Sequence, residues 1–497
     1  MAAKKDELIP RLKNFFGQFK IATGPFTPPE GFRSHEIGKI RIAADPNIPV
    51  IPLLSASGEK IGYFLGTLID YQAGRVVRDE VRLPEGKDSR TASTIPESAI
   101  EDAIYQFAGS FLCVVSTNNI SRIYLDASGT KPLVFDPETK AAASSTGLIL
   151  DDEEYVARFR QDLFDRLDVN GVGWFPSFLT AHEGVRRLLC NHYLDLDTWG
   201  IVRHWPLHEL PPEPDFEIAV DRICSVVERS LAAITNDDNT VSALTAGNET
   251  RFLLAMSRQV AEKINFVTVR KPVPTLDAIR AGELAERFNL AHRYCDIAYA
   301  TDEEARLWQY NASHCVGGDN KYTHKSVQSL SNNAYFVGGL GGEVARAFFW
   351  RPSDDTSLHV DTAQIVPRFG MPSSRTVFEA TEEWLEQLPD MNSFIKLDLA
   401  YLELRLSAWA FAQAYSGVMN MSRIHPMICR ETYALMLALP PEAKRGNRMI
   451  IEGIRQRWPE LLEMPINRYG DYRDKLQFIR KMLRPKAVIK KLRKLYG

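Results

Sequence analysis

Apolar and polar positions divide the chain into a strand-rich first part and a second part in which strands and helices alternate. Between about residues 48 and 135, apolar runs such as "IPVIPLLS", "KIGYFLGTLIDY" and "GSFLCVVST" are separated by Gly, Asn and Ser. β-branched and aromatic residues are frequent in these runs, which is typical of strands. "SRIYLDASGTKPLVF" continues the pattern, and one helix is expected at "IPESAIEDAIYQFA". We therefore predict a β-rich first domain.

A proline-rich segment separates the two parts. Four prolines lie between Trp205 and Glu217, and proline removes a backbone donor that a helix needs. The sequence therefore predicts a first domain over residues 1–206, a linker over 207–215 and a second domain over 216–497. The second domain opens with an apolar stripe at helical spacing, formed by Phe216, Val220, Ile223, Val227, Leu231 and Ile234.

Strand and helix patterns then alternate. "TVSALTAG" precedes the helical "NETRFLLAMSRQVAEK", "INFVTVRK" precedes "TLDAIRAGELAERFNL", and a third strand, "NAYFVGGLGGE", runs into "VARAFFWR". Such alternation predicts a parallel sheet flanked by helices, with functional turns at the carboxyl ends of its strands. From about Thr381 onward the pattern is mainly helical.

Composition narrows the class of protein. The 497 residues are 45% hydrophobic and 25% charged, with a formal net charge of −3, which suits two or three globular domains and gives no sign of nucleic-acid binding. The N-terminus lacks the apolar stretch of a secretory signal, and no run reaches the roughly 18 apolar residues of a membrane span. We expect a cytoplasmic protein without a transmembrane segment.

The cysteines and the C-terminus add two smaller expectations. Six cysteines are scattered without a CxxC pair or metal-ligand spacing, so we expect reduced thiols rather than disulfides or a zinc site. The basic C-terminus, "RKMLRPKAVIKKLRKLYG", is read first as a solvated helix face. Contact with an anionic membrane surface is the less favoured alternative.

The stretch "ALTAGNETRF", residues 243–252, joins a buried strand to a helix. The start of a helix presents N–H groups and the positive end of the helix dipole, which favour an anion. Ala246 and Gly247 would let a phosphate approach the backbone, and Thr245 and Thr250 can donate hydroxyl hydrogen bonds. The carboxylate of Glu249 suits such a site if Mg²⁺ lies between it and the phosphates.

A second glycine-rich turn, "VGGLGGE" at residues 337–343, strengthens this hypothesis. Parallel strands place successive turns at the same edge of a sheet. Two turns that each supply one glutamate, Glu249 and Glu343, could therefore surround one polyphosphate.

These elements resemble the asparagine synthetase family, whose pyrophosphate loop has the pattern SGGxDS. "TAGNET" matches this pattern with conservative changes, and "RFLLA" is similar to the helix start that follows it. "YFVGGLGGEVAR" stands where the family has "LSGDGxDE", with Glu343 at the glutamate and Gly342 in place of the preceding aspartate, a likely magnesium ligand in the family. "ICRETYALMLALPPEAKRGNRMIIEGIRQRWPELLEMPINR" resembles the C-terminal region of synthetase-like proteins often found with surface-polysaccharide genes.

The first domain also resembles a class II glutamine amidotransferase domain. "YQFAGSFLCVVSTNNISRIYLDASGTKPLVF" and "EGVRRLLCNHYLDLD" are similar to patterns of that domain. Its glutaminase would need an N-terminal cysteine nucleophile, whereas here Ala2 follows Met1 and Cys113 is the first cysteine. The resemblance implies an α/β and α+β protein: an inactive Ntn-hydrolase-like β-rich sandwich, then a parallel-sheet ATP-pyrophosphatase domain with a helical C-terminal part.

The resemblance implies ATP and Mg²⁺ as cofactors, with Glu249 as the metal ligand. Catalytic roles are expected for Glu343 and for Arg346, which follows it by about one helical turn, although a structural ion pair is an equal alternative for Arg346 and for Arg251. Lys271, after the second strand, is a weaker candidate. The residues expected to bind the nucleotide are Leu244, Thr245, Ala246, Gly247, Glu249, Thr250, Arg251, Val267, Lys271, Gly338, Gly339 and Gly341.

Several assignments stay open. The family has a late lysine in acyl transfer, for which Lys444 and Lys475 are conceivable, and four histidines are not assigned to catalysis: His292, His314, His324 and His425. Substrate-facing residues are expected within 311–325 and in the C-terminal helices. The oligomeric state is not fixed by the sequence, and a homodimer is one option.

The favoured function is a glutamine-independent, ATP-dependent ligase that joins a small-molecule or saccharide carboxylate to an amine through an acyl-adenylate. The alternative is a non-catalytic scaffold that kept the fold, which the glycine at position 342 and the missing nucleophile favour. A nucleotide-dependent transferase is a third option. The conservative exchange at Glu249 favours an enzyme, because a decaying loop would lose its carboxylate.

Overall fold

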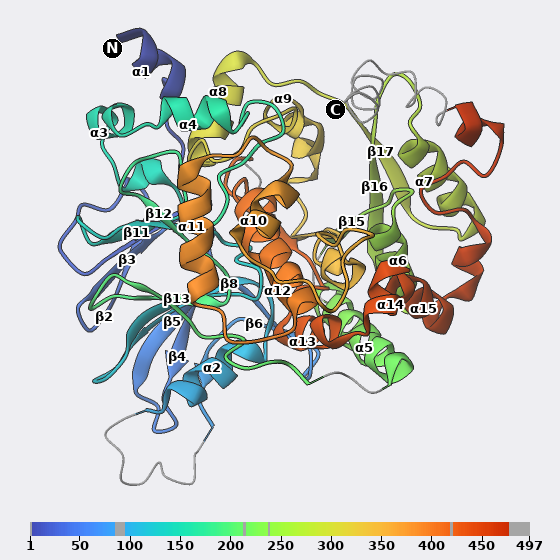
Figure 1. Cartoon of the computed structure of the whole chain (residues 1–497), viewed down its shortest axis with the longest axis horizontal. Coiled ribbons are helices and arrows are strands. Elements are labelled where there is room, and N and C mark those ends of the chain that lie inside the picture. Colours follow the sequence, from blue (N-terminus) through green and yellow to red (C-terminus); the bar gives the residue numbers. More distant parts are fainter. Residues whose placement is uncertain (1, 85–94, 212–214, 237–238, 418–420, 477–497) are drawn as a thin grey trace.

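The computed structural model describes residues 2–84, 95–211, 215–236, 239–417 and 421–476 (Figure 1). The structure is mixed α/β, and it contains two sheets from the N-terminal part and one parallel sheet from the C-terminal part. The two N-terminal sheets lie on one side of the molecule and the parallel sheet on the other, with C-terminal helices between them (Figure 1).

The first two sheets pack face to face. One has the strand order β12-β10-β11-β1-β3-β2, and the other has the order β14-β13-β9-β8-β5-β4-β7, with β6 paired to β5. Apolar side chains from both sheets, among them Phe19, Leu65, Leu112 and Phe135, form one core, as expected for a two-layer sandwich. The first sheet contains β1 (Phe19–Ala22), β2 (Arg33–Ile37), β3 (Ile40–Ala44), β10 (Leu133–Asp136), β11 (Ala141–Ala143) and β12 (Arg186–Leu188). The second contains β4 (Val50–Leu54), β5 (Lys60–Asp70), β6 (Arg75–Val77), β7 (Val81–Arg82), β8 (Ala108–Ser116), β9 (Ser121–Leu125), β13 (His192–Asp195) and β14 (Ile201–Arg203).

The β-rich character predicted for residues 48–135 is confirmed. The expected helix is α2 (Glu97–Tyr105), whose Ile100 and Ile104 pack on the outer face of the second sheet against Phe64 and Phe111. β1, β2 and β3 were not predicted, because these strands are short and β2 is largely exposed. Three short helices complete this part: α1 (Ala2–Leu8), α3 (Asp152–Ala157) and α4 (Gln161–Arg166).

The helix predicted after the proline-rich segment is α5 (Phe216–Thr235). It begins where the Asp215 carboxylate accepts hydrogen bonds from the N–H groups of Glu217 and Ile218, a usual N-cap arrangement. Its apolar stripe is buried against α6 (Asn248–Met256) and α15 (Arg448–Arg457).

The parallel sheet has the order β17-β16-β15-β18-β19, and all its pairs are parallel. Three of the strands fall where the sequence predicts them: β15 (Thr240–Ala243), β16 (Ile264–Arg270) and β18 (Tyr335–Val337). The other two, β17 (His292–Asp296) and β19 (Ser422–Ile424), were not predicted. Helix α7 (Leu276–Arg287) packs on β16 and β17.

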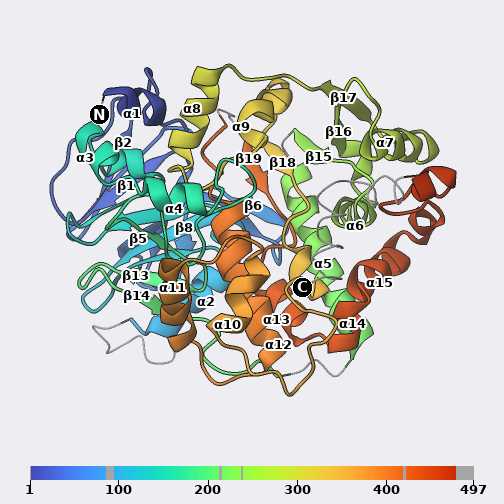
Figure 2. The ribbon, with the colours of Figure 1, turned by 45° about the horizontal axis from the view of Figure 1, so that its top comes forward.

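Helices dominate from residue 362 to 457, in agreement with the predicted helical part, apart from β19. A π-helical stretch over Ala400–Ala410 continues α12, and this long element lies between the sandwich and the parallel sheet (Figure 2). The helices of this range that have not yet been named are α10 (Thr362–Ile365), α11 (Arg375–Glu386), α12 (Ser393–Leu399), α13 (Arg430–Ala438) and α14 (Pro441–Arg445). Two further helices, α8 (Asp302–Asn311) and α9 (Asn320–Thr323), precede it.

A buried polar network, here called the Glu403 joint, links the two parts of the chain. Glu403 in the π-helical stretch accepts two hydrogen bonds from Arg203 of β14, with N–O distances of 2.9 and 2.7 Å. The same carboxylate accepts from Asn191 at 2.7 Å and from Trp384 at 2.5 Å. Asn191 in turn accepts from Arg430 at 2.6 Å. The N-terminal sandwich is therefore fixed to the C-terminal helices by a buried, paired charge.

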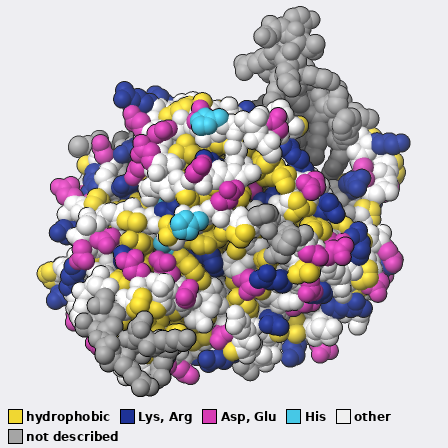
Figure 3. All heavy atoms as spheres, turned by 60° about the horizontal axis from the view of Figure 1, so that its bottom comes forward, with side chains coloured by type: hydrophobic (Ala, Val, Ile, Leu, Met, Phe, Trp, Pro, Cys, Tyr) yellow, Lys and Arg dark blue, Asp and Glu magenta, His cyan; other side chains and the backbone are white. Residues whose placement is uncertain are grey.

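Within the described ranges, no helix is long and apolar enough to cross a membrane. Lys, Arg, Asp and Glu side chains are interspersed over the face in Figure 3. The basic C-terminal segment, for which a membrane contact was considered, lies outside the described residues. All six cysteines are free and buried.

Candidate functional site

The first glycine turn joins β15 to α6, as the sequence predicts. Gly247 is the N-cap of α6. The hydroxyl oxygens of Thr245 and Thr250 are 2.7 Å apart, and the N–H of Gly247 donates to the Thr245 hydroxyl at 3.1 Å. The two threonines therefore face each other across the turn and form a polar rim at the start of the helix.

The second turn lies beside the first because β18 pairs in parallel with β15. A Cβ atom on Gly339 would lie 2.8 Å from the Cβ of Glu249, closer than side chains approach. Gly341 has a φ of +105°, a conformation that glycine tolerates best. Glycine at both positions thus lets the second turn pack directly on the first turn of α6. The helix expected after the second turn is only a short 3₁₀ segment, Gly342–Arg346.

The two turns bring Glu249, Glu343 and Arg346 together. A guanidinium nitrogen of Arg346 lies 2.8 Å from a Glu249 carboxylate oxygen and 3.7 Å from a Glu343 oxygen. The other Glu343 oxygen accepts a hydrogen bond from the N–H of Gly341 at 2.9 Å. Burial and the nearby charge of Glu249 raise the pKa of Glu343. Arg346 is therefore the cation next to two glutamates whose negative charges repel each other.

This cluster keeps unused binding capacity. Arg346 Nε is buried and has no hydrogen-bond partner within the described residues, whereas Glu249 Oε1 is the oxygen that pairs with another nitrogen of Arg346 at 2.8 Å. No group of three or more His, Cys, Asp or Glu side chains in the described ranges is arranged to hold a metal. The two glutamates can still supply oxygen ligands to Mg²⁺ if phosphate oxygens or water provide the rest.

The structure also places an unexpected acid at the first turn. The Asp277 carboxylate, at the start of α7, accepts a hydrogen bond from the N–H of Ala246 at 3.0 Å. The N–H of Asn467 donates to the Ala246 carbonyl at 2.8 Å. A backbone donor expected to meet phosphate is thus engaged by a carboxylate. No local pattern predicts this contact, because Asp277 is an ordinary acid in the first turn of a helix.

The prediction that Arg251 lies beside the phosphate loop is wrong. Its side chain is fully buried and donates to the carbonyls of Leu461 and Met464 at 2.7 and 3.1 Å. Each helical residue is rotated by about 100° from the one before it, so Arg251 faces the C-terminal segment while Thr250 faces the turn. Burial lowers the pKa of Arg251 to about 10.

The remaining cofactor-binding candidates lie in or beside the sheet edge. Leu244 and Val267 are buried, and the Leu244 N–H donates to the Val267 carbonyl at 2.9 Å. Lys271 lines a hollow of about 550 Å³ at the end of β16, together with Arg270 and Tyr294. Gly338 is held to β19, because its N–H donates to the Ile424 carbonyl at 2.9 Å. These positions are compatible with the predicted site but provide no direct contact with a ligand.

Gly342 stands against Met427. A Cβ atom on Gly342 would lie 2.9 Å from the Met427 sulfur and 3.4 Å from Cγ of Glu249. An aspartate at this position would therefore need Met427 to move. The Met427 side chain thus fills the space that an aspartate side chain at position 342 would need.

The two late lysines considered for acyl transfer differ in their surroundings. Lys444 is buried, lies 2.6 Å from an Asp398 oxygen and donates to the Leu437 carbonyl at 2.9 Å. Burial raises the pKa of Asp398 despite this pair. Lys475 is exposed. Lys444 is therefore a partner in a structural ion pair.

Segment 311–325, expected to face a substrate, instead contacts the N-terminal part. Ser313 accepts a hydrogen bond from the N–H of Thr146 at 2.9 Å, and Val316 forms a bridge with Trp174. His314 contacts the hydroxyl of Tyr155 at 2.8 Å. The buried part of this segment is thus an interdomain contact, a role that local spacing does not reveal.

The other unassigned histidines differ in their surroundings. His292 contacts the Thr268 hydroxyl at 2.9 Å, and His324 contacts the Lys321 carbonyl at 2.9 Å. His425 is buried, and its Nδ1 has no hydrogen-bond partner among the described residues. Burial lowers the pKa of His425 to about 4, so its ring is neutral at pH 7. His425 was not assigned a role from the sequence, and it lines a cavity between the N-terminal sandwich and the C-terminal part.

Comparisons with known proteins identify no family. No family model and no curated protein matches the sequence. One solved structure, described as the allosteric regulatory enzyme of purine biosynthesis, aligns at 11% identity over 57% of this chain and 60% of that chain, with a TM-score of 0.22. Another, glutamine phosphoribosylpyrophosphate (PRPP) amidotransferase from B. subtilis complexed with ADP and GMP, aligns at 10% identity over the same shares, with a TM-score of 0.20. The chain thus spans about 60% of these structures' length, and at such TM-scores the likeness carries no argument.

Proposed function

We propose that this protein is an ATP-dependent amide-forming ligase that works without glutamine hydrolysis. In this reaction a substrate carboxylate oxygen bonds to the α-phosphorus of ATP, and pyrophosphate leaves. An amine nitrogen then bonds to the acyl carbon, loses a proton and displaces AMP. The single observation that supports the proposal is the contact of Arg346 with both Glu249 and Glu343 where two adjacent parallel strands end.

Each residue of the cluster has a chemical role in this proposal. Glu249 and Glu343 would supply oxygen ligands to Mg²⁺, which relieves their mutual repulsion. Arg346, released from its ion pairs, would donate to phosphate oxygens. Thr245 and Thr250 offer hydroxyl donors at the N-terminus of α6, where the helix dipole favours an anion. Bound MgATP supplies the leaving pyrophosphate that drives the reaction.

The hollow beside Lys271 is the proposed site of the nucleoside. It lies at the carboxyl end of β16, next to the strand that leads into the phosphate-binding turn. Tyr294 and Ile297 offer apolar surface for a base, and Lys271 offers a cation. Ligands of open α/β sheets bind at this edge.

Glutamine-independent chemistry is proposed because the described cysteines are unsuited to act as nucleophiles. All six are buried, and burial raises the pKa of Cys113, Cys190 and Cys429. A thiolate is the reactive form of cysteine, so a raised pKa suppresses attack at neutral pH. The amine would therefore come from a free amine or from the substrate itself.

The test measures ATP binding by isothermal titration calorimetry, with and without Mg²⁺, for the full chain and for Glu249→Gln. The amide keeps an oxygen but removes the negative charge that attracts Mg²⁺, so the Mg²⁺-dependent affinity is expected to fall about tenfold or more. Glu262→Gln, on the exposed surface, is the matched control. ATP–pyrophosphate exchange over a panel of carboxylates that includes uronic acids then tests adenylation. Absence of ATP binding by the full chain rejects the ligase.

A non-catalytic scaffold is the second candidate, and the contact between Asp277 and Ala246 favours it. This carboxylate occupies a donor and adds negative charge where phosphates would lie. Asp277→Ala frees the N–H of Ala246 and removes that charge. A ligase site should then bind MgATP about three- to tenfold more tightly. If neither the full chain nor Asp277→Ala binds MgATP, the scaffold is the better description.

A further inference from the structure

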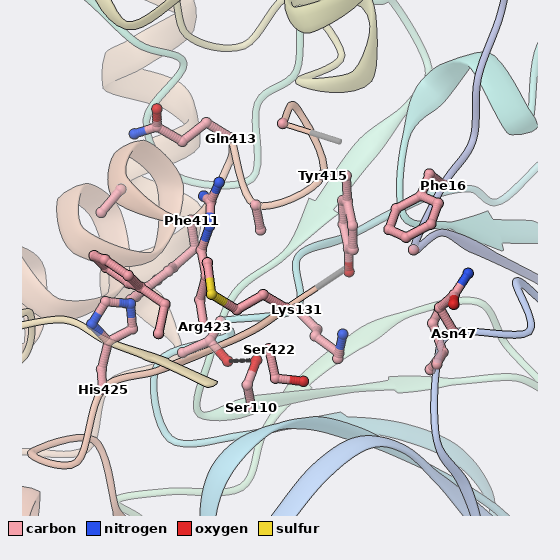
Figure 4. Close-up of a pocket in the computed structure, with 18 of the residues that line it drawn as sticks. Phe16, Asn47, Ser110, Lys131, Phe411, Gln413, Tyr415, Ser422, Arg423 and His425 are labelled. Carbon is pink, nitrogen blue, oxygen red and sulfur yellow. Dashed lines mark hydrogen bonds between the residues drawn. The ribbon is translucent and has the colours of Figure 1, made fainter. Parts of the chain in front are cut away.

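A second cavity lies between the N-terminal sandwich and the C-terminal part. Its volume is about 370 Å³, at the lower end of the range for small-molecule sites. Lys131, before β10, enters from the sandwich, and Arg423 of β19 enters from the parallel sheet. Figure 4 shows Lys131 and Tyr415 on one side of the hollow, with Arg423, Phe411 and His425 on the other.

The charge of this cavity has one sign. Its described lining contains Lys131 and Arg423 but no aspartate or glutamate. No hydrogen bond or ion pair joins either cation to another group within the described ranges. The nearest acid that acts on Lys131 is Asp126, which is fully engaged by the N–H groups of Phe111, Ser128 and Thr130 and by the Thr130 hydroxyl.

The positions of Lys131 and Arg423 make their charged forms less stable than they would be in water. Burial lowers the pKa of Lys131 to about 8, against the partial support of Asp126, and it also lowers the pKa of Arg423. Other cations in the molecule have partners: Lys444 pairs with Asp398, Arg203 pairs with Glu403, and Arg251 donates to two backbone carbonyls. Both side chains are half-buried at the edge of the cavity, and a charge that has lost part of its water and has no partner is unfavourable unless something compensates it.

A third polar group faces the same hollow. His425 lines the cavity, is 8% exposed, and has an Nδ1 atom without a partner among the described residues. A neutral imidazole carries one N–H donor, so it can add a hydrogen bond to an anion. Ser110 and Ser422 also line the cavity.

Most of the remaining lining is apolar, although Asn47, Thr130 and Gln413 also belong to it. Phe336 and Leu340 come from the parallel-sheet side, Phe411 follows the π-helical stretch, and Ile48 and Pro49 come from the sandwich. Such walls favour a ligand with a hydrocarbon body rather than a bare inorganic ion.

We propose that this interdomain cavity binds a small organic acid, whose negative charge Lys131 and Arg423 attract from opposite sides of the hollow and whose apolar body lies between the two walls. The acid supplies the negative charge that the cavity lacks, and charge-assisted hydrogen bonds compensate both cations. This site does not depend on nucleotide binding at the glycine turns, so it holds whether or not the protein is a ligase.

The test is calorimetric titration of the full chain at pH 7 without nucleotide. The probes are glutarate and benzoate, their neutral counterparts glutaramide and benzamide, and inorganic phosphate. We expect at least one acid to bind with a Kd below about 1 mM, and the matching amide to bind at least tenfold more weakly. Lys131→Met and Arg423→Met should each lower the affinity of that acid about tenfold or more, and Lys131→Arg should restore most of it.

Two further measurements distinguish failure of this proposal from failure of the proposed ligase function. Acetic anhydride labelling of Lys131, read by mass spectrometry, should be slowed by the bound acid. Glu249→Gln should bind the acid as the full chain does, so a failed ligase does not mask this site. If Arg423→Met does not fold, Lys131→Met and the labelling decide. The proposal is overturned if neither acid binds, if the amide binds equally well, if phosphate binds as tightly as the acid, or if Lys131→Met leaves the affinity unchanged.

Discussion

The contact between the N-terminal sandwich and the C-terminal part contains two polar regions that differ in whether their charges are paired. At the Glu403 joint, Arg203 is paired with a carboxylate that also accepts from Asn191 and Trp384. In the interdomain cavity, Lys131 and Arg423 have no acidic partner among the described residues. Burial alone would raise the pKa of Glu403, but its contacts with Arg203 and Asn191 hold that pKa below its usual value.

This difference separates a structural contact from a candidate binding site. A network whose members satisfy one another has little to offer a ligand, and it fixes the two parts of the chain. A pair of uncompensated cations at the edge of a hollow is costly to the fold and offers its charge to a ligand. The contribution of each charge to the free energy of unfolding tests this difference.

The largest effect is expected for Glu403→Gln. The change leaves Arg203 buried without a countercharge, and breaking a buried pair in this way costs about 3–5 kcal/mol of unfolding free energy. Urea unfolding at pH 7 measures it, with the exposed Glu262→Gln as control. A loss under about 1 kcal/mol would mean that the joint does not stabilise the interface, and the contrast with the cavity would disappear.

A smaller effect of opposite sign is expected for Lys131→Met. The folded pKa of Lys131 is about 8, below its usual 10.5, so between these pH values the unfolded chain binds more protons and stability rises with pH. The charge therefore destabilises the fold below pH 8. At pH 7 Lys131→Met should be more stable than the native chain by about 1–3 kcal/mol, a discounted value because the side chain meets the cavity.

That gain should shrink as pH rises from 8 and vanish near 10.5. Unfolding measured from pH 7 to pH 11 checks the trend, and Lys263→Met, at an exposed lysine, should show no such change. A gain that stays constant with pH would show that lost charge is not its cause, and a loss of stability at pH 7 would show that Lys131 has a partner after all.

The glycine turns could be predicted because their signal is local. A buried strand, a small-residue turn and an amphipathic helix stand next to one another in the sequence, and parallel pairing places the two turns side by side. The proximity of Glu249 and Glu343 thus follows from topology alone. The direction of Arg251 does not, because one step along a helix turns a side chain away from its neighbour's target.

The cavity could not be predicted from local patterns. Lys131 and Arg423 are far apart in the sequence, and each stands in a segment whose pattern is ordinary. The short strand β19 lies in a region of helical character, so periodicity gives no sign that Arg423 enters a sheet. Asp277 and Asn467 also reach the first turn from distant segments. Contacts of this kind depend on tertiary packing rather than on propensity.

The smallest effect is expected for Ser422→Ala, in the cavity wall. The Thr67 hydroxyl, which is buried, donates to the Ser422 hydroxyl at 2.9 Å and links the sandwich to β19. Removing the acceptor leaves one neutral donor without a partner, at a cost of about 1 kcal/mol. Urea unfolding measures this cost, and Thr67→Val in the Ser422→Ala background should recover part of it because both polar groups are then gone. A cost as large as that of Glu403→Gln would show that the cavity wall, and not only the joint, holds the two parts together, because a single neutral hydrogen bond cannot account for 3–5 kcal/mol.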